Sequence, residues 1–322
     1  MRSAYLQIIR ICNQDCIFCA QPQNGNIMTL EEILNKLVFY KKEWVKKIIL
    51  TWGEPTLHKD LSSILRLCEK FWFEIILQTN WSLLYKDEII DKLKWSRWFE
   101  IMISLHSHKW EIHDKLKNSI WSFNNTINWI KKINNDLKIV NIKIAIAVCK
   151  LNLPNFKQTI KFILKEFPYI KGIIINNLDA FNIPNENLDI VSKLHLFDKN
   201  FLEWLWLILN SWKTLNIERV PLCYLEWFES YSDSLEYILG NDTKYVHYLQ
   251  NDREGFFLWK EARTPKWSFW IKCSICDLKW ICWWIPRLWE LYDESELNPK
   301  IISKERINEI LNIFYKNNNE LN

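Results

Sequence analysis

Short apolar stretches alternate with amphipathic stretches along residues 4–180, and this alternation constrains the fold more than any other feature. Apolar residues with a period of 2 predict strands, and a period of about 3.6 predicts helices. We expect strands at 4–10, 46–51, 73–79, 99–105, 142–148 and 172–177, and helices at 29–43, 59–70, 86–94, 120–134 and 154–167. Serial βα units predict an α/β fold with a parallel sheet, open or curled into a partial barrel.

The pattern changes after about residue 195, so we expect two domains. Residues 1–195 form the α/β core domain and residues 196–322 form a C-terminal extension. The extension starts with a helix at 198–213 and a short strand at 216–221. A small, irregular, cysteine-containing region follows at 223–290, and a last helix covers 301–316.

Three cysteines lie close together directly after the first predicted strand. Cys12, Cys16 and Cys19 belong to the stretch CNQDCIFC, which is a loop at the carboxyl end of that strand. Three thiolates on one loop can bind three irons of a [4Fe–4S] cluster and leave the fourth iron open, whereas ordinary ferredoxin clusters have four cysteine ligands. A structural zinc site or a chance spacing is the alternative interpretation.

The C-x3-C-x2-C spacing, with Phe18 before the last cysteine, resembles the signature of the radical S-adenosylmethionine (SAM) superfamily. The resemblance extends over about residues 4–180. It implies a partial (β/α)6 barrel of the TIM type, with a [4Fe–4S] cluster on the three cysteines and SAM on the open iron. The positions that match the family's SAM-binding segments are Phe18, Trp52, Gly53, Glu54, Pro55, Asn80, Ser104 and Asn152.

The resemblance also implies a reaction. One electron from the reduced cluster cleaves SAM, and the resulting 5′-deoxyadenosyl radical takes a hydrogen atom from the substrate. A radical SAM enzyme of this kind acts on a peptide or a small molecule and uses an external one-electron donor such as flavodoxin or ferredoxin. The sequence identifies no catalytic residue, although His106 is placed to line a substrate cavity.

A second group of cysteines lies in the extension. Cys273, Cys276 and Cys282 occur in CSICDLKWIC, and Cys223 completes a set of four. This pattern resembles the auxiliary-cluster extensions called SPASM and twitch, although the full SPASM pattern has another cysteine where this chain has Pro286. We therefore expect one auxiliary [4Fe–4S] cluster, and structural zinc is the alternative.

Charge and hydropathy limit the kinds of partner and the cellular compartment that we expect for this protein. The net charge of +4 is mild and there is no long basic run, so nucleic acid is not expected as a partner. The longest apolar stretch, near FLEWLWLIL, is too short to span a bilayer, and the N-terminus lacks a signal-peptide pattern. We expect a cytoplasmic protein, in which nine cysteines favour cluster or metal chemistry over disulfides.

Two other functions fit the same motifs. One is a non-catalytic protein on a degenerate radical SAM scaffold that binds zinc or a closed cluster. The other is a radical SAM enzyme that modifies RNA.

The counts of two residue types are abnormal. The chain has 5 Gly and 20 Trp, together 25, whereas a protein of this length usually has roughly 23 Gly. Trp also stands where the family has glycine: at Trp52 in the Gly-Gly-Glu-Pro loop, at Trp81 after Thr-Asn, and at Trp283 or Trp284. We hypothesise that the gene uses UGA for glycine and that the printed sequence reads this codon as tryptophan. If the tryptophans are genuine, the indole of Trp52 crowds the methionine end of SAM.

Overall fold

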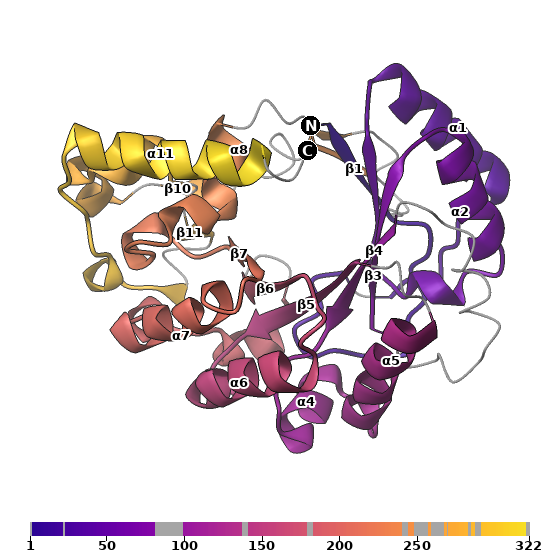
Figure 1. The fold of residues 1–322 in the computed structure, drawn as a ribbon, viewed down its shortest axis with the longest axis horizontal. Helices are drawn as coiled ribbons and strands as arrows, with labels where there is room; N and C mark the ends of the chain where they lie inside the picture. The colour runs from indigo at the N-terminus through magenta and orange to yellow at the C-terminus, as the bar shows by residue number, and fades with distance from the viewer. Residues whose placement is uncertain are drawn as a thin grey trace.

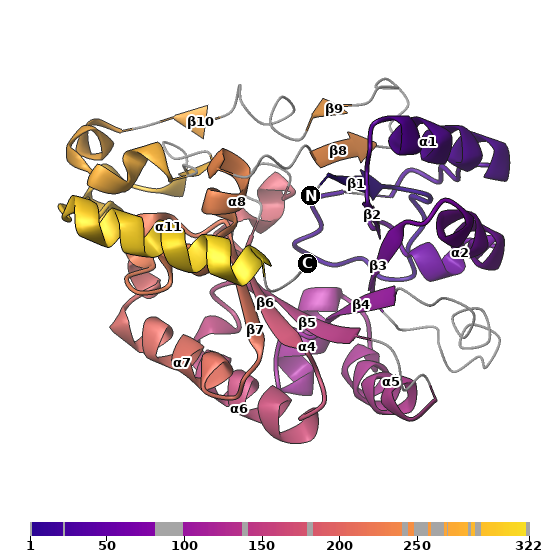
Figure 2. The same cartoon turned by 45° about the horizontal axis from the view of Figure 1, so that its top comes forward.

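A curled parallel sheet forms the centre of the molecule, with the strand order β7-β6-β5-β4-β3-β2-β1-β8-β9. The computed structural model describes residues 2–21, 23–80, 99–136, 141–178, 183–239, 244–247, 257–258, 267–268, 270–282, 285–286 and 291–319. Strands β1 to β8 all run parallel, and β9 pairs antiparallel with β8. The sheet forms a half-barrel with helices on its outer side (Figure 1, Figure 2). The predicted α/β class and partial barrel are confirmed.

The strands of this sheet are β1 Ser3–Leu6, β2 Lys47–Leu50, β3 Glu74–Thr79, β4 Phe99–Ser104, β5 Asn141–Val148, β6 Gly172–Asn177, β7 Thr214–Glu218, β8 Lys244–His247 and β9 Phe257–Leu258. The longer helices are α1 Leu30–Lys42, α2 Leu61–Lys70, α4 Trp110–Lys117, α5 Ser122–Asp136, α6 Phe156–Glu166, α7 Lys199–Leu209, α8 Asp233–Leu239 and α11 Lys304–Asn319. The six predicted strands and most predicted helices are present. The helix predicted at 86–94 lies outside the described residues.

Local sequence explains where the first helix begins. Thr29 is the N-cap of α1, and its hydroxyl accepts a hydrogen bond from the Glu32 N–H at 3.2 Å. The Glu32 carboxylate accepts the Thr29 N–H in return, at 2.6 Å. This reciprocal capping box satisfies two backbone donors that a helix N-terminus otherwise leaves without partners.

The two faces of the sheet differ in burial. Along β3 and β5, fully buried residues alternate with partly exposed ones. The buried face, with Leu77 and Ile144 among its members, packs into the main hydrophobic core. Because successive strand residues point to opposite faces, the partly exposed residues line the inner, concave side of the half-barrel.

The sheet extends beyond the predicted core domain. Strand β7 pairs with β6, and β8 pairs with β1, so residues after 195 contribute two of the parallel strands. The boundary at residue 195 stays a prediction, and the sheet continues across it. The remaining described extension contains the small β10–β11 ribbon of Trp267–Ser268 and Ile285–Pro286 and the helix α11 (Figure 1). An ion pair at 2.9 Å between Arg306 of α11 and Glu229 helps to hold this helix against the body.

Candidate functional site

The three cysteines of the first loop lie beyond the carboxyl end of β1. Cys12, Cys16 and Cys19 are free and half-buried. The loop folds back on itself, because the Cys19 N–H donates to the Cys16 carbonyl at 2.9 Å. It is also tied to α4, where the Leu116 carbonyl accepts the Ile17 N–H at 3.1 Å. The predicted ligands therefore share one tethered loop at the carboxyl end of the parallel strands, where ligands bind in folds of this kind.

Burial controls the protonation of these thiols. It raises the pKa of Cys16 to about 11, and it also raises the pKa of Cys12 and Cys19. In each case the charge of Lys117 opposes the shift, because a nearby cation favours the thiolate. The thiols are consequently protonated in the free protein at neutral pH. Cluster binding must release these protons, because only thiolates ligate iron.

The donor set fits a cluster better than a single ion. Among the described residues, no three His, Cys, Asp or Glu side chains are arranged to hold one metal ion. In a cubane each cysteine binds a different iron, so the three thiols must be spread around a cluster. Three half-buried thiols on one loop, with Cys12 and Cys19 close enough to act on Cys16, are compatible with this requirement.

Glu54 connects two loops at the carboxyl edge of the sheet. The side chain is fully buried, and its carboxylate accepts the Thr56 N–H at 3.0 Å, the Thr79 hydroxyl at 2.7 Å and the Asn80 N–H at 2.7 Å. Its own N–H donates to the Ile11 carbonyl at 2.9 Å. Glu54 thus holds the loop after β2 against the end of β3 and against the cysteine loop. Its role in this structure is to position these loops.

Asn80 brings the end of β3 into contact with the cysteine loop. Its side-chain amide lies 3.2 Å from the Cys12 Sγ and donates to the Asn13 Oδ1 at 3.0 Å. Amide donors to sulfur stabilise a thiolate and tune a bound cluster. The predicted SAM-binding Asn80 therefore lies directly beside a predicted iron ligand.

Asn152 and His106 join the ends of β4 and β5. The Asn152 side chain is buried and bonds at 2.8 Å to the carbonyls of His106 and Ala147 and to the Cys149 N–H. The His106 Nδ1 accepts the Ala147 N–H at 3.1 Å, which leaves its proton on Nε2. No described residue accepts a hydrogen bond from this buried Nε2. His106 also contacts Phe18 edge to face, with 4.9 Å between ring centroids, so it reaches the cysteine loop.

Lys117 is a buried cation that the sequence reasoning missed. It is the last residue of α4, and its side chain is only 2% exposed. Its charge acts on all three cysteines and on His106 and His113. A fully buried lysine is rare unless it has an anionic partner. One indication of its burial was present in the sequence. Lys117 lies four residues after His113, and this spacing places both side chains on the same helix face.

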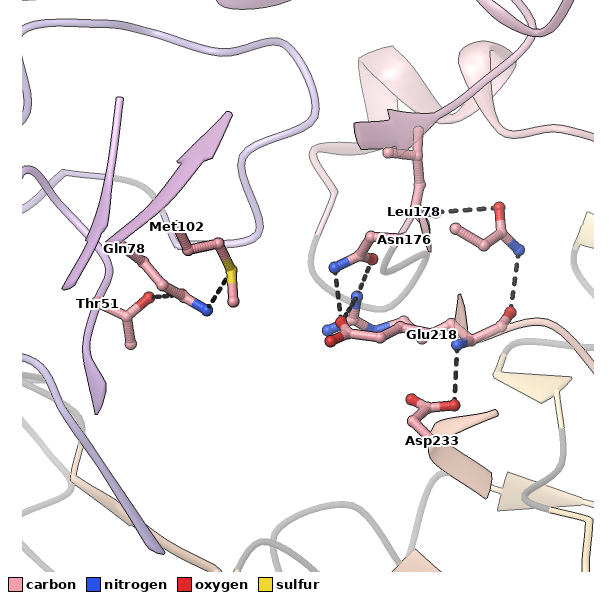
Figure 3. Close-up of polar contacts among 9 residues, drawn as sticks. Thr51, Gln78, Met102, Asn176, Leu178, Glu218 and Asp233 are labelled. Carbon is pink, nitrogen blue, oxygen red and sulfur yellow. Dashed lines mark hydrogen bonds and ion pairs between the residues drawn. The ribbon is translucent and has the colours of Figure 1, made fainter. Parts of the chain in front are cut away.

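Two polar groups line the concave side of the half-barrel (Figure 3). On one side Thr51 bonds to Gln78, which also lies 3.1 Å from the Met102 sulfur. On the other side Asn176 of β6 donates to Glu218 of β7 at 2.7 Å. Arg219 donates to Asn176 and lies 3.7 Å from Glu218. We call Asn176, Glu218 and Arg219 the β6–β7 polar group.

The four cysteines of the extension lie near one another. The charges of Cys273 and Cys276 act on Cys223, and those of Cys223, Cys273 and Cys276 act on Cys282. All four are free and half-buried. Burial raises the pKa of Cys223 to about 12 and also raises that of Cys282, and the neighbouring cysteines add to both shifts. The Lys300 N–H lies 3.4 Å from the Cys276 Sγ.

The remaining predicted site residues lie in several different elements. Gly53 and Pro55 lie in the loop after β2, and Ser104 ends β4. Trp52 adopts a left-handed backbone with φ 59°, and its ring centroid lies 5.9 Å from that of Tyr5. Trp81, Trp283 and Trp284 lie outside the described residues.

No helix in the described ranges combines the length and the apolarity that crossing a membrane requires.

Comparison with known proteins agrees with this geometry. Residues 6–163 match the radical SAM superfamily model. The chain is 30% identical over 161 residues to a probable GTP 3′,8-cyclase of Saccharolobus islandicus, and the match covers 49% of this chain and 50% of that protein. A putative glycyl-radical enzyme activating enzyme of Methanocaldococcus jannaschii is 29% identical over 177 residues, covering 52% of this chain and 68% of that one. The chain thus spans about half the length of the cyclases that it matches.

Solved structures share the fold over a longer stretch. SuiB of Streptococcus suis, bound to S-adenosylmethionine, superposes with a TM-score of 0.65 at 16% identity over 87% of this chain and 71% of SuiB. The AdoMet-bound anSMEcpe superposes with a TM-score of 0.62 at 16% identity over 98% of this chain and 96% of that chain. The half-barrel and the three-cysteine loop agree with the match of residues 6–163 to the radical SAM superfamily model.

Proposed function

We propose that this protein is a radical SAM enzyme that holds a [4Fe–4S] cluster on Cys12, Cys16 and Cys19. The observation that carries the proposal is the tethered loop with three free thiols at the carboxyl end of β1, inside a segment that matches the superfamily. When bound, the cluster supplies the electron that cleaves SAM to a 5′-deoxyadenosyl radical, which abstracts hydrogen from the substrate.

Side chains of this protein position the loops around the proposed cluster and supply a positive charge beside it. Lys117 is the buried cation next to the thiols, and we assign it to the carboxylate of SAM. A buried ammonium needs an anion, and a charge-assisted hydrogen bond satisfies both groups. Glu54, whose carboxylate accepts hydrogen bonds from Thr56, Thr79 and Asn80, fixes the position of the Gly53 loop, which would contact the methionine end of SAM. The buried Nε2–H of His106 is a further donor for the bound cofactor or substrate.

We also propose one auxiliary [4Fe–4S] cluster on Cys223, Cys273, Cys276 and Cys282. Support comes from the influence of the other cysteines on Cys223 and Cys282 and from the half-buried state that all four share. Four cysteine ligands close all four irons, so such a cluster transfers electrons or anchors the extension. Nine free cysteines fit a reducing compartment, and we place the protein in the cytoplasm.

The substrate we propose is a peptide that binds across the concave side of the half-barrel. SuiB is solved with its precursor peptide SuiA, and anSMEcpe with the Cp18Cys peptide. Both share the fold of this chain. The β6–β7 polar group offers both an acidic and a basic side chain to peptide amide and charged groups. An external one-electron donor of the flavodoxin or ferredoxin kind supplies the reducing electron.

A second candidate is catalysis on a small nucleotide. The sequence relatives favour it, because the cyclases match at 30% identity. A substrate panel of short peptides and of GTP separates the two classes, since hydrogen transfer into 5′-deoxyadenosine from a deuterated substrate identifies the one that reacts.

Anaerobic reconstitution tests the proposal. We expect about eight irons per chain, as two four-iron clusters require, and release of 5′-deoxyadenosine after reduction with dithionite. The Cys12→Ala variant is expected to lose SAM cleavage. The matched control is Cys68→Ala, which removes a fully buried thiol of α2. Bound zinc in place of iron, without SAM cleavage, refutes the proposal and leaves a non-catalytic metal-binding protein.

A further inference from the structure

We infer that six tryptophans of the printed sequence are glycine in the translated protein. A backbone φ between about +20° and +160° favours glycine and strains other residues. Eight non-glycine residues in the described chain have a positive φ, and six of them are tryptophan. They are Trp44 (60°), Trp52 (59°), Trp72 (62°), Trp121 (65°), Trp212 (58°) and Trp227 (73°).

Other aromatic residues provide the control. The chain has 17 Phe and 11 Tyr, and none of those in the described ranges has a positive φ. A large aromatic ring therefore does not favour this backbone region, and the enrichment belongs to tryptophan alone.

Three of the six tryptophans end a helix in the same way. At the end of α1 the Trp44 N–H donates to the Lys41 carbonyl at 3.2 Å, and the Val45 N–H donates to the Tyr40 carbonyl at 3.0 Å. These two bonds define the Schellman motif, whose left-handed position is usually glycine and sometimes asparagine.

Helices α2 and α7 repeat the motif. The Trp72 N–H donates to Glu69 at 2.8 Å, and the next N–H donates to Cys68 at 3.0 Å. The Trp212 N–H donates to Leu209 at 2.9 Å, and the next N–H donates to Ile208 at 3.4 Å. Helix α4 ends with the same bonds, but there the left-handed residue is Asn118, which tolerates that conformation.

The indoles at these helix ends gain little from packing. Trp212 is 95% exposed, Trp72 is 82% exposed and Trp44 is 73% exposed. A strained backbone is normally retained where surrounding contacts or a function compensate for it. Exposed indoles in solvent offer no such compensation, whereas glycine needs none.

The SAM-loop position adds a separate observation. Trp52 and Gly53 both have φ 59°, so two left-handed residues follow each other. The space at the second position is closed, because a Cβ on Gly53 would lie 2.3 Å from the Ile9 carbonyl oxygen. With glycine at position 52 the loop reads Gly-Gly-Glu-Pro.

One change of codon meaning accounts for all six positions. UGA differs from the glycine codon GGA only in its first base, and reading UGA as tryptophan would produce this pattern. The inference covers the six left-handed positions only. It does not include Trp129, which is 4% exposed within α5 and packs in the core. Since it rests on φ values and hydrogen bonds, it is independent of the proposed enzymatic function.

Tandem mass spectrometry of peptides from protein purified from its own cells tests the inference. We expect glycine at positions 52, 72 and 212, each encoded by UGA in the gene. Tryptophan at any of the six positions, or a UGG codon there, overturns it. The measurement reads residue identity directly, so an absence of SAM cleavage affects the proposed function and leaves this result unchanged.

Discussion

Replacing Trp212 by glycine should stabilise the chain as printed, although the change removes the whole side chain. Trp212 ends α7 with φ 58° and is 95% exposed. Its indole therefore contributes almost no burial to the folded state. The backbone strain that it imposes should disappear in the Trp212→Gly variant.

The size of the effect follows from two opposing terms. A left-handed backbone costs a residue with a Cβ roughly 1–2 kcal/mol. Glycine in turn gives the unfolded chain more freedom, which costs about 0.4–1 kcal/mol of stability. The difference is a gain of about 1 kcal/mol in the free energy of unfolding. Changing Trp44 and Trp72 as well should raise the gain to roughly 2–3 kcal/mol if the three sites add independently.

The matched control lies on the same helix. Trp206 is inside α7, where glycine costs helix stability relative to other residues, by up to about 1 kcal/mol. Trp206→Gly also removes the contact with Phe228, whose ring centroid lies 4.8 Å away. The same substitution should therefore destabilise the chain at position 206 and stabilise it at position 212.

Urea unfolding of the three recombinant proteins, followed by far-ultraviolet circular dichroism, measures the difference. The expected order of midpoints is Trp212→Gly, then the printed sequence, then Trp206→Gly, with unchanged slopes. If Trp212→Gly lowers the midpoint as much as Trp206→Gly does, the strain argument is wrong.

Three further predictions concern the site and the extension. Lys117→Met should raise the KM for SAM by roughly 10-fold or more, because a buried charge-assisted bond contributes about 1.5–3 kcal/mol; Lys115→Met, on the exposed face of the same helix, should leave it unchanged. Burial lowers the pKa of His113 well below its usual range, so the unfolded state binds more protons below the unperturbed value of about 6.5. The free energy of unfolding should therefore fall as the pH drops from about 7 to 5, and the fall should be smaller in the His113→Gln variant. Equal urea midpoints at the two pH values would contradict this prediction. Cys223→Ser should lower bound iron from about eight to about four per chain, and an unchanged iron content excludes this cysteine as a ligand.

Much of the fold could be predicted because the spacing of apolar residues and the capping of helices depend on residues that are close in the sequence. The apolar runs that became β2 to β6 alternate clearly with helical stretches, and Thr29 with Glu32 indicates where α1 begins. Helix α4 was missed because it is short and follows a polar loop. The pairing of β8 with β1 was also missed, since it joins segments that are far apart in the sequence.

The candidate site was only partly predictable for a similar reason. The cysteine spacing predicts the loop that we propose for the cluster, because the three cysteines lie within eight residues of one another in the sequence. Lys117 resembles any surface lysine in the sequence, and only the tertiary structure buries it beside the thiols. Glu54 was expected to contact the cofactor, and its hydrogen bonds from Thr79 and Asn80 at the end of β3 become apparent only when the two loops are assembled.

The position of β1 in the sheet has a consequence for biosynthesis. This strand leaves the ribosome before the other strands of its sheet, yet its second neighbour, β8, is made only when residues 244–247 are translated. Until then β1 is an edge strand, with unpaired backbone groups that attract other chains. The loop that carries Cys12, Cys16 and Cys19 is attached to this unfinished edge until β8 has been made. Iron–sulfur insertion is therefore expected to be late, after the C-terminal part of the chain has closed the sheet.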